Sequence, residues 1–339
     1  MTATRLGLMG FGRIGRNVFR LLHDRDDLDV VAISDIADPS ALTYLLKYDS
    51  IYGRFPIEVS YGDGVLDYGT KQVAFTDARL PSDTSWASLG VDIVLDTTSR
   101  YRTLASLQGH FDSGARKVVL TSSPEIPGEI PLLLRGVNDE TLDDNPDVIA
   151  LGSNTSNAVA PILRTLDEAF GLRRAYMTTV KAMSNSGRLA DVPTDSFRTS
   201  RAAGENIIPS ETNSAEILTQ VLPELEGKLS VVALNVPVVD GSTVNMVAET
   251  EQSTDAAAVN DAVRSAIDEK YAGVVEYVDD PIVSSDLRLD PHSGIFDSLA
   301  TFVTGDNLVK TITWFNNGWA YSHRAVEVAT AIARNGGSK

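Results

Sequence analysis

The sequence predicts a two-domain α/β protein, with a mainly parallel sheet in the N-terminal half and a mixed or antiparallel sheet in a second, α+β half. Three observations lead to this prediction. The chain has 339 residues and 43% hydrophobic content, and a chain of this length usually divides into two domains, each with its own core. In the first half, strand and helix patterns alternate as in βαβ units. In the second half, strand patterns come in long pairs, which favours antiparallel neighbours.

The first half begins with an apolar strand at residues 5–9 and a helix at 11–23 whose apolar side chains recur on one face. A second apolar strand follows at 28–35. Strand, helix and strand at this spacing form a βαβ unit, and its crossover is expected to be right-handed. Further strands are predicted at 91–95 and 117–121, with a helical stretch between them. The sheet of this half is therefore predicted to be mainly parallel.

The second half has a predicted helix at 259–271. Hydrophobic runs or alternation predict strands at 175–182, 229–237, 242–249 and 308–315. Residues 184–209 are rich in Ser, Arg, Gly and Pro and have no clear period, so we expect a long ordered loop of the kind that often carries function. The last helix, at 320–333, is expected to pack back on the first domain.

The composition excludes several classes of function. The formal net charge of −17 argues against nucleic acid or an anionic membrane surface as the main partner, because both are negatively charged. The chain has no cysteine, which excludes disulfides, thiolate catalysis and Cys-based metal sites. No signal peptide precedes the first strand and no apolar run is long enough to span a bilayer, so we expect a cytoplasmic protein. The four histidines are scattered along the chain, and no metal site is predicted.

A glycine-rich motif predicts a dinucleotide site. Residues 10–15 read Gly-Phe-Gly-Arg-Ile-Gly, follow a strand and open a helix, and Asp35 ends the next strand twenty residues after Gly15. That is the spacing expected for a carboxylate that binds the adenosine ribose, while the helix N-terminus stabilises the pyrophosphate. Asp35 would repel a 2′-phosphate and Ile36 supplies no positive charge, so NAD is favoured over NADP; the alternative is a turn that only packs helix on strand. The predicted cofactor residues of this Rossmann-type domain are Gly10, Phe11, Gly12, Arg13, Ile14, Gly15 and Asp35.

A second candidate site lies at residues 152–161, Gly-Ser-Asn-Thr-Ser-Asn-Ala-Val-Ala-Pro, between an apolar strand at 148–151 and a predicted helix. Chemistry often occurs at such a corner, because a helix N-terminus offers free N–H groups and the positive end of the helix dipole. Yet the stretch contains no Cys, His or ionisable group. Asn154 and Thr155 can orient and polarise a carbonyl group, but the stretch cannot form an acyl-enzyme.

Several segments along the whole chain resemble one family, in the same order. They are Gly-Phe-Gly-Arg-Ile-Gly-Arg-Asn-Val-Phe-Arg at 10–20, Leu-Leu-Lys-Tyr-Asp-Ser at 45–50, Asn-Ile-Ile-Pro at 206–209 and Asp-Pro-His-Ser-Gly-Ile-Phe-Asp at 290–297. These segments resemble the phosphorylating glyceraldehyde-3-phosphate dehydrogenase family. The resemblance implies an NAD domain at 1–153 and 318–339 with a returning C-terminal helix, a catalytic domain with a mixed sheet at 154–317, and a homotetramer.

The catalytic pair of that family is not carried over. The family's nucleophilic Cys, in Ser-Cys-Thr-Thr-Asn-Cys-Leu-Ala-Pro, falls on Asn154, and the His that follows Thr-Thr-Val falls on Lys181. An amide cannot attack a carbonyl carbon at useful rates, because its nitrogen lone pair is delocalised. We therefore predict that the chain is not a phosphorylating aldehyde dehydrogenase.

The family's anion sites are also altered. Asn235 stands where an Arg before Val-Pro holds the substrate phosphate, and Asn213 and Glu216 replace a Gly and a Lys. A pocket with amides and hydroxyls in these places suits a neutral polar group. The predicted substrate-binding residues are Ser153, Ser184, Ser186, Arg198, Arg201, Thr212, Asn213 and Asn235.

The nicotinamide side of the family is retained. Asn317, in Trp-Phe-Asn-Asn at 314–317, matches the residue that holds the carboxamide, and Tyr321 matches a Tyr near the nicotinamide. Thr97 and Thr121, at or just after the ends of two predicted strands, complete the predicted cofactor residues.

Three functions remain open. The first, which we favour, is an NAD-dependent oxidoreductase that transfers a hydride between the cofactor and a small carbonyl or alcohol substrate without a covalent intermediate. Lys181 would be its acid/base, if burial lowers the pKa from about 10.4 towards neutrality. The second is a catalytically inactive NAD-binding homologue with a regulatory or assembly role. The third is a non-redox epimerase or dehydratase that uses NAD, with Lys181 again as the acid/base.

Overall fold

The structure is a computed structural model that describes residues 3–184 and 187–336. The chain divides into two compact units, each with its own sheet. The first unit comprises residues up to 133, residues 138–152 and residues from 321 onward. The second comprises residues 134–137 and 153–320.

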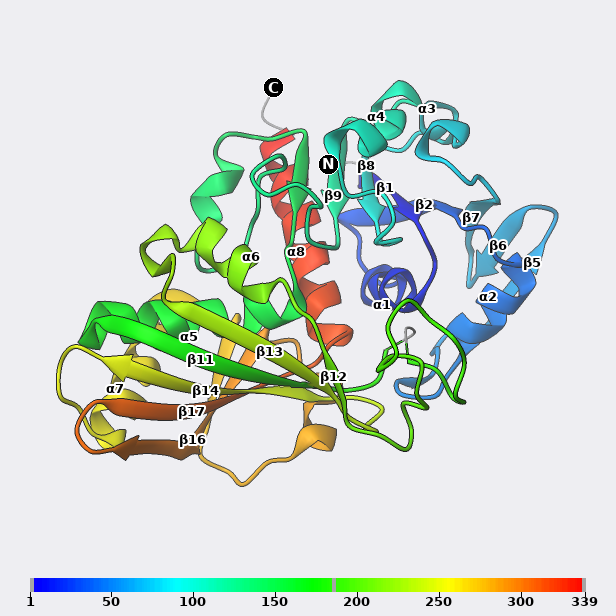
Figure 1. Cartoon of the computed structure of the whole chain (residues 1–339). Helices are drawn as coiled ribbons and strands as arrows, with labels where there is room; N and C mark the ends of the chain where they lie inside the picture. Colours follow the sequence, from blue (N-terminus) through cyan, green and yellow to red (C-terminus); the bar gives the residue numbers. More distant parts are fainter. Residues whose placement is uncertain (1–2, 185–186, 337–339) are drawn as a thin grey trace. The chain divides into compact units, whose positions relative to one another are not determined.

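The first unit is built on an eight-stranded sheet in the order β10-β9-β8-β1-β2-β7-β6-β5 (Figure 1). Its strands are β1 (Thr4–Met9), β2 (Leu28–Ser34), β5 (Val59–Gly62), β6 (Val65–Tyr68), β7 (Lys71–Thr76), β8 (Ile93–Asp96), β9 (Lys117–Leu120) and β10 (Val148–Ala150). From β10 to β7 all neighbouring strands are parallel, whereas β7, β6 and β5 pair in antiparallel fashion. The predicted parallel sheet is confirmed, with an antiparallel edge that the sequence analysis does not predict.

Helices complete the first unit, and its buried side chains include two hydrophobic core clusters. Its helices are α1 (Arg13–Leu22), α2 (Pro39–Lys47), α3 (Trp86–Leu89), α4 (Leu104–Asp112) and, from Tyr321 on, α8 (Trp319–Gly336), and a short strand pair is formed by β3 (Tyr48–Asp49) and β4 (Gly53–Arg54). The apolar face of α1 buries Val18 and Phe19, as its periodicity predicts. Val328 and Ala329 of α8 belong to the same core cluster. The end of the chain therefore stabilises the fold that carries the glycine-rich turn.

The second unit contains a seven-stranded mixed sheet in the order β12-β13-β11-β14-β17-β16-β15. Its strands are β11 (Leu172–Lys181), β12 (Ile208–Ser210), β13 (Leu229–Asn235), β14 (Ser242–Thr250), β15 (Val275–Val278), β16 (Gly294–Thr304) and β17 (Leu308–Phe315). The pairs β11–β13 and β15–β16 are parallel, and the other neighbours are antiparallel. The predicted mixed sheet is confirmed. The sequence analysis does not predict β16, because its register shifts between Asp297 and Phe302 and this irregularity interrupts the alternation.

Helices α5 (Asn154–Phe170), α6 (Ser214–Val221) and α7 (Ala256–Ala266) belong to the second unit. Helix α5 contacts β11, β14, β16 and β17, so it packs against the sheet (Figure 1). Helix α7 begins three residues before the predicted start, because Asp255 accepts the Ala258 N–H at 2.8 Å and caps the helix there. A π-helical turn over Ile267–Tyr271 continues it to the predicted end.

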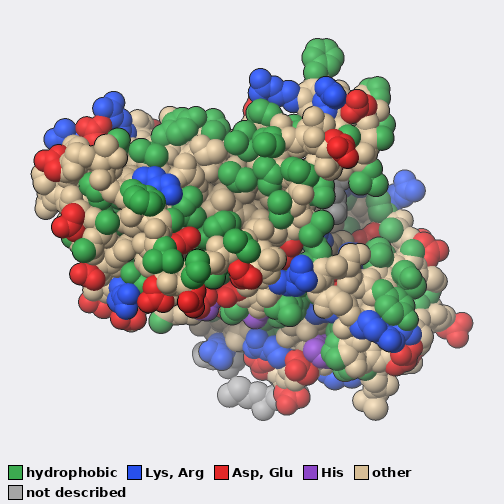
Figure 2. Space-filling view, turned by 90° about the horizontal axis from the view of Figure 1, so that it is seen from below, with side chains coloured by type: hydrophobic (Ala, Val, Ile, Leu, Met, Phe, Trp, Pro, Cys, Tyr) green, Lys and Arg blue, Asp and Glu red, His purple; other side chains and the backbone are tan. Residues whose placement is uncertain are grey.

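Between Lys181 and β12 the described residues form a loop that contains one isolated bridge, between Arg188 and Ala202. Within residues 3–184 and 187–336, no helix combines the length and the apolar character needed to cross a membrane. Figure 2 shows acidic and basic side chains interspersed over the visible face, with hydrophobic side chains in patches between them.

Candidate functional site

The glycine-rich turn of residues 10–15 joins β1 to α1 in the first unit. Gly10 has a φ of +92°, which residues with a side chain rarely adopt. A Cβ on Gly15 would lie 2.3 Å from the Gly10 oxygen, so the missing side chain lets α1 pack on the turn. At Gly12, the N-cap residue of α1, a Cβ would have no neighbour within 4 Å. No side chain caps this helix and its first turn has no acidic residue, so its N–H groups are available to an anion.

Asp35 lies beside this turn. One carboxylate oxygen accepts the Phe11 N–H at 2.6 Å, and the other accepts the Ala37 N–H at 2.9 Å. Each oxygen keeps a lone pair for a ribose hydroxyl. The side chain of Ile36 is 59% exposed and brings no positive charge. An uncapped helix N-terminus and a held carboxylate fit the pyrophosphate and ribose of NAD.

The other predicted residues of the motif differ in their surroundings. The ring of Phe11 packs in the core against Phe19 and Phe75, with ring centroids 5.8 and 5.9 Å apart. Only the backbone of Phe11 can therefore face a ligand. Arg13 and Ile14 are half-buried on the first turn of α1.

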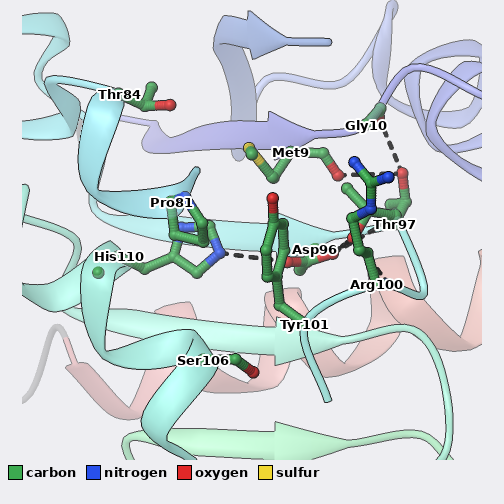
Figure 3. A network of polar contacts seen from close by, with 12 residues as sticks. Met9, Gly10, Pro81, Thr84, Asp96, Thr97, Arg100, Tyr101, Ser106 and His110 are labelled. Atoms are coloured by element: carbon green, nitrogen blue, oxygen red, sulfur yellow. Dashed lines mark hydrogen bonds and ion pairs between the residues drawn. The ribbon is translucent and has the colours of Figure 1, made fainter. Parts of the chain in front are cut away.

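The hydroxyls of Thr97, Thr121 and Tyr321 are all bonded within the first unit. Thr97 Oγ1 donates to the Gly10 oxygen at 2.8 Å (Figure 3). Thr121 Oγ1 donates to the backbone oxygen at the end of β8 at 3.0 Å, and the Tyr321 hydroxyl donates to the Gly152 oxygen at 2.7 Å. Burial raises the pKa of Tyr321 and keeps it protonated. These side chains brace the strand ends, and their contact with the cofactor stays a prediction.

Helix α5 of the second unit begins at Asn154. Ser153 Oγ accepts the Ser156 N–H at 3.0 Å, which makes Ser153 the N-cap residue. Asn154 Oδ1 accepts the Thr155 N–H at 2.9 Å, so this N–H is not free to stabilise an oxyanion. Thr155 is 1% exposed, and its Oγ1 has no hydrogen-bond partner among the described residues. The Thr155 hydroxyl is thus a buried side-chain group of this corner that the described residues leave unpaired.

A chain of hydrogen bonds joins the start of α5 to the end of β11. Asn154 Nδ2 donates to the Asn317 backbone oxygen at 3.1 Å. Ser242 Oγ donates to Asn317 Oδ1 at 2.5 Å and accepts the N–H of Ala182, the residue after Lys181, at 3.0 Å. The structure thus links the segments that carry Asn154, Lys181 and Asn317. The Asn317 amide nitrogen has no acceptor in the described part of the chain, so it can donate to a carboxamide oxygen.

Lys181 is the last residue of β11 and pairs in register with Asn235 of β13. Its side chain is half-buried. Burial lowers the pKa of the amine, because the charged form loses hydration. Among residues 3–184 and 187–336, no hydrogen bond or ion pair holds this amine. An amine in this state can exchange a proton with a bound ligand.

A pocket lies in the same unit as this strand end. It is lined by Met183, Ser184, Gly187, Thr199, Ala203, Ile208 and Asn235. None of these side chains is charged, and the polar ones are hydroxyls and one amide. Asn235 Nδ2 donates to Ser210 Oγ at 3.2 Å, which leaves its oxygen and one N–H for a ligand. The predicted substrate residues Ser184 and Asn235 therefore share one pocket, whereas Ser186 lies outside the described residues.

The remaining predicted substrate residues do not line this pocket. The Arg201 guanidinium contacts the Asp191 carboxylate at 3.2 Å, and both side chains are exposed. Arg198 is exposed on the same loop. Thr212 Oγ1 bonds to the hydroxyl of the first α6 residue at 2.8 Å, and Asn213 is the exposed N-cap residue of that helix. An anion at this loop would therefore compete with Asp191 for Arg201.

Ser242 is a residue of this site that the sequence analysis misses. Its hydroxyl joins strand ends that meet only after β11, β14 and β17 have paired. The local pattern shows only that Ser242 starts a predicted strand, so no short-range signal reveals its contacts.

Comparison with known proteins identifies the family. The family model "Glyceraldehyde 3-phosphate dehydrogenase, NAD binding domain" matches residues 4–104, and "Glyceraldehyde 3-phosphate dehydrogenase, C-terminal domain" matches residues 153–317. Glyceraldehyde-3-phosphate dehydrogenase of Mycobacterium avium is 39% identical over 338 residues, which is 98% of this chain and 99% of the relative. The enzymes of Geobacillus stearothermophilus (39%) and Bacillus subtilis (38%) match over 335 residues with the same coverage. Together with the NAD-binding geometry of the first unit, these matches show that the chain belongs to the glyceraldehyde-3-phosphate dehydrogenase family and uses NAD as its cofactor.

Proposed function

We propose that this chain is an NAD(H)-dependent oxidoreductase that transfers a hydride between the cofactor and a small carbonyl or alcohol substrate, with Lys181 as the acid/base. The observation that carries the proposal is the state of Lys181. Its half-buried amine has a lowered pKa and no counter-ion among the described residues. Hydrogen bonds through Ser242 and Asn317 join its strand end to the start of α5.

Acyl-enzyme chemistry is not available to the chain. It has no cysteine, and Asn154 occupies the position that the family resemblance assigns to the nucleophile. Both polar atoms of this amide bond within the protein, Oδ1 to the Thr155 N–H and Nδ2 to the Asn317 oxygen. We therefore infer that the chain does not oxidise aldehydes to acyl phosphates, although the relatives carry the name of that enzyme.

The side chains of this site act on the substrate oxygen. When bound, NADH supplies the hydride that reduces a carbonyl carbon. The Thr155 hydroxyl, which is buried and unpaired among the described residues, donates a hydrogen bond to the carbonyl oxygen. The Lys181 ammonium gives that oxygen a proton as it becomes an alcohol, and in the reverse direction the neutral amine accepts the proton. A lowered pKa favours this exchange, because it brings the two forms of the amine closer in population near neutral pH.

The pocket of Ser184 and Asn235 supports a substrate whose distal end is uncharged. Its lining offers hydroxyls, one amide and apolar carbon. Burial of a phosphate there would leave its charge without a partner, which is unfavourable. A hydroxyl or amide of the substrate can instead exchange hydrogen bonds with Asn235 and Thr199.

We also propose that the chain forms a homotetramer. Several large apolar side chains of the second unit are more than a third exposed, among them Tyr176 on β11, Val232 on β13 and Phe302 on β16. Exposed apolar side chains are candidates for protein–protein contacts where they gather on one surface. Light scattering that gives four times the chain mass supports the proposal, and a monomeric mass contradicts it.

A second candidate is an NAD-binding protein without catalytic activity. One observation favours it. Asn154 Oδ1 accepts the hydrogen bond of the Thr155 N–H, which would otherwise be available to stabilise an oxyanion at the helix start. In this case NAD binds to the first unit, but no carbonyl compound is turned over.

The test follows NADH absorbance with a panel of small carbonyl compounds, offered as phosphorylated and unphosphorylated pairs. We expect turnover of an unphosphorylated compound, and a loss of kcat/KM of about 100-fold or more in Lys181→Met, the range for loss of a general acid. Lys310→Met is the matched control, because burial also lowers the pKa of Lys310, on β17, and we expect its kcat/KM to stay unchanged. No turnover with any compound, with NADH binding confirmed by fluorescence, would favour the second candidate.

A further inference from the structure

Two fully buried ionisable side chains, Asp96 and His110, lie behind the glycine-rich turn and take no part in the proposed chemistry. Both are 0% exposed. Asp96 ends β8, and His110 lies on α4 with its Nε2 3.2 Å from Asp96 Oδ2. Figure 3 shows Asp96 between His110 and Thr97. A carboxylate in a protein core is unfavourable unless donors surround it, so its partners show what it holds in place.

The hydrogen bond from Trp86 fixes the tautomer of His110. The indole Nε1–H can only donate, and it lies 3.0 Å from His110 Nδ1. Nδ1 must therefore carry a lone pair, and the ring proton lies on Nε2, where it donates to Asp96. His110 is thus a neutral imidazole, and the negative charge of the pair belongs to Asp96 alone.

Asp96 holds the loop that follows β8. Its Oδ1 accepts the N–H of Thr98 at 2.9 Å and the hydroxyl of Thr98 at 2.7 Å. Thr98 Oγ1 accepts the Arg100 N–H at 3.1 Å. Between them, Ser99 has a φ of +55°, which a residue with a side chain keeps only where its surroundings hold it. The conformation of this loop therefore depends on the Asp96 carboxylate.

The same loop packs directly against the glycine-rich turn. Thr97 donates from Oγ1 to the Gly10 oxygen and from its N–H to the Met9 oxygen, both at 2.8 Å. A Cβ on Gly10 would lie 3.1 Å from the Thr98 nitrogen, and one on Gly15 would lie 3.1 Å from Thr97 Oγ1. Because Thr97 is hydrogen-bonded to the turn and neither glycine has room for a Cβ, we expect a shift of the loop to displace the turn.

We propose that Asp96 and His110 are positioning residues for NAD. The neutral imidazole of His110 holds the Asp96 carboxylate, and the carboxylate holds the loop after β8 against the turn that receives the pyrophosphate. Neither side chain has to touch the cofactor. The proposal concerns the affinity for NAD and not the chemistry of Lys181. It can therefore fail while the proposed function holds, and the proposed function can fail while this proposal holds.

The first test measures the dissociation constant of NAD⁺ by calorimetry for the full-length chain and two Thr98 variants. Thr98→Val keeps the shape of the side chain but removes the hydroxyl that bonds to Asp96. We expect its dissociation constant to rise about tenfold, as for the loss of one hydrogen bond to a charged group. Thr98→Ser restores the hydroxyl and should bind NAD⁺ like wild type. Wild-type affinity in Thr98→Val would overturn the proposal.

The second test separates positioning from general stability. His110→Leu removes the donor to Asp96, whereas the amide of His110→Gln can still donate to Asp96 and accept from Trp86. We expect weaker NAD⁺ binding in His110→Leu and recovery in His110→Gln. Leu107→Ala is the control, because Leu107 is buried on the same helix and its truncation removes only packing. We expect it to lower the free energy of unfolding and leave NAD⁺ affinity unchanged. Equal losses of NAD⁺ affinity in Leu107→Ala and His110→Leu would overturn the proposal. If His110→Leu does not fold, the comparison of Thr98→Val with Thr98→Ser decides the question.

Discussion

The side-chain nitrogen of Asn154 donates a 3.1 Å hydrogen bond to the backbone oxygen of Asn317 and so ties the start of α5 to the end of β17. The family resemblance assigns a nucleophile to this position. In this chain the position is a structural link instead, because the amide also accepts the Thr155 N–H. Chemistry at this corner must therefore use other groups, and we propose Thr155 and Lys181 for it.

Restoring a thiol at this position should not restore the phosphorylating reaction. In Asn154→Cys we expect no phosphate-dependent NADH formation from glyceraldehyde 3-phosphate above the wild-type background. Lys181 in its ammonium form is a poor base for the thiol, and Asn235 brings no positive charge for a phosphate. Absorbance at the NADH band measures the reaction, and Asn154→Cys combined with Lys181→His is the companion variant. Substantial activity of Asn154→Cys alone would show that the site is misinterpreted.

The hydroxyl of Thr155 should matter for turnover and not for stability. Thr155→Val removes a buried hydroxyl that has no partner among the described residues, so we expect an unchanged or slightly higher free energy of unfolding. For a donor to the developing oxyanion, kcat/KM should fall roughly 100-fold. Thr311→Val removes a buried hydroxyl on β17 that also has no partner among the described residues, and it should leave kcat/KM unchanged. Equal effects of the two variants would contradict this role.

Burial of Lys181 predicts a pH-dependent stability. The pKa of this amine is lowered in the folded chain, so between that value and the unfolded value near 10.4 the folded chain binds fewer protons. The free energy of unfolding therefore rises with pH across this window. Urea denaturation should show Lys181→Met as more stable than wild type at neutral pH, with a gap that narrows as the pH approaches about 10.4. A gap that does not change with pH would mean that the amine is solvated.

Asp35 and Ile36 should determine the choice between NAD and NADP. Asp35 is held by the Phe11 and Ala37 N–H groups, and its charge repels a 2′-phosphate. The variant Asp35→Ala with Ile36→Arg removes the repulsion and adds a cation. We expect the ratio of the two dissociation constants, measured by fluorescence titration, to shift towards NADP by about tenfold or more. Asp35→Ala alone should weaken NAD binding without creating tight NADP binding.

The pocket of Ser184 and Asn235 should bind phosphate only after a cation is introduced. In wild type, whose pocket lining has no charged side chain, we expect inorganic phosphate to leave the Tm unchanged. The Tm of Asn235→Arg should rise by several degrees at millimolar phosphate, because a ligand that binds the folded state raises its stability. Gln252→Arg, at an exposed position of the same unit, controls for added charge. A rise in the Tm of the wild type with phosphate would contradict the proposal that this pocket binds an uncharged end of the substrate.

Short-range patterns predict much of the fold. The glycine-rich turn, α1 and β2 follow from apolar periodicity and motif spacing, and the mixed sheet follows from paired strand patterns. The antiparallel edge of the first sheet is not predicted. Strand β16 is not predicted either, because an irregularity after Asp297 interrupts its alternation. These parts depend on pairing between segments, which local patterns do not report.

The candidate site divides in the same way. Asn154 and Lys181 stand out in the sequence because they occupy positions of recognisable motifs. Their partners do not, since Ser242 meets Asn317 only across paired strands. The Trp86–His110 bond likewise joins two helices of the first unit, and neither residue shows a local signal of that role. Motifs indicate these positions, whereas the hydrogen bonds and the burial of their side chains follow only from the tertiary structure.

Transfer of deuterium tests the central claim most directly. Wild type and Lys181→Met are incubated with the carbonyl panel and with NADH that carries deuterium at both C4 positions, and the alcohol products are analysed by mass spectrometry. The account predicts one deuterium on the product carbon with wild type. In Lys181→Met we expect the rate of product formation to fall by about 100-fold or more, with unchanged affinity for NADH. Products without label while NADH is bound, or equal rates in the two proteins, would contradict Lys181-assisted hydride transfer.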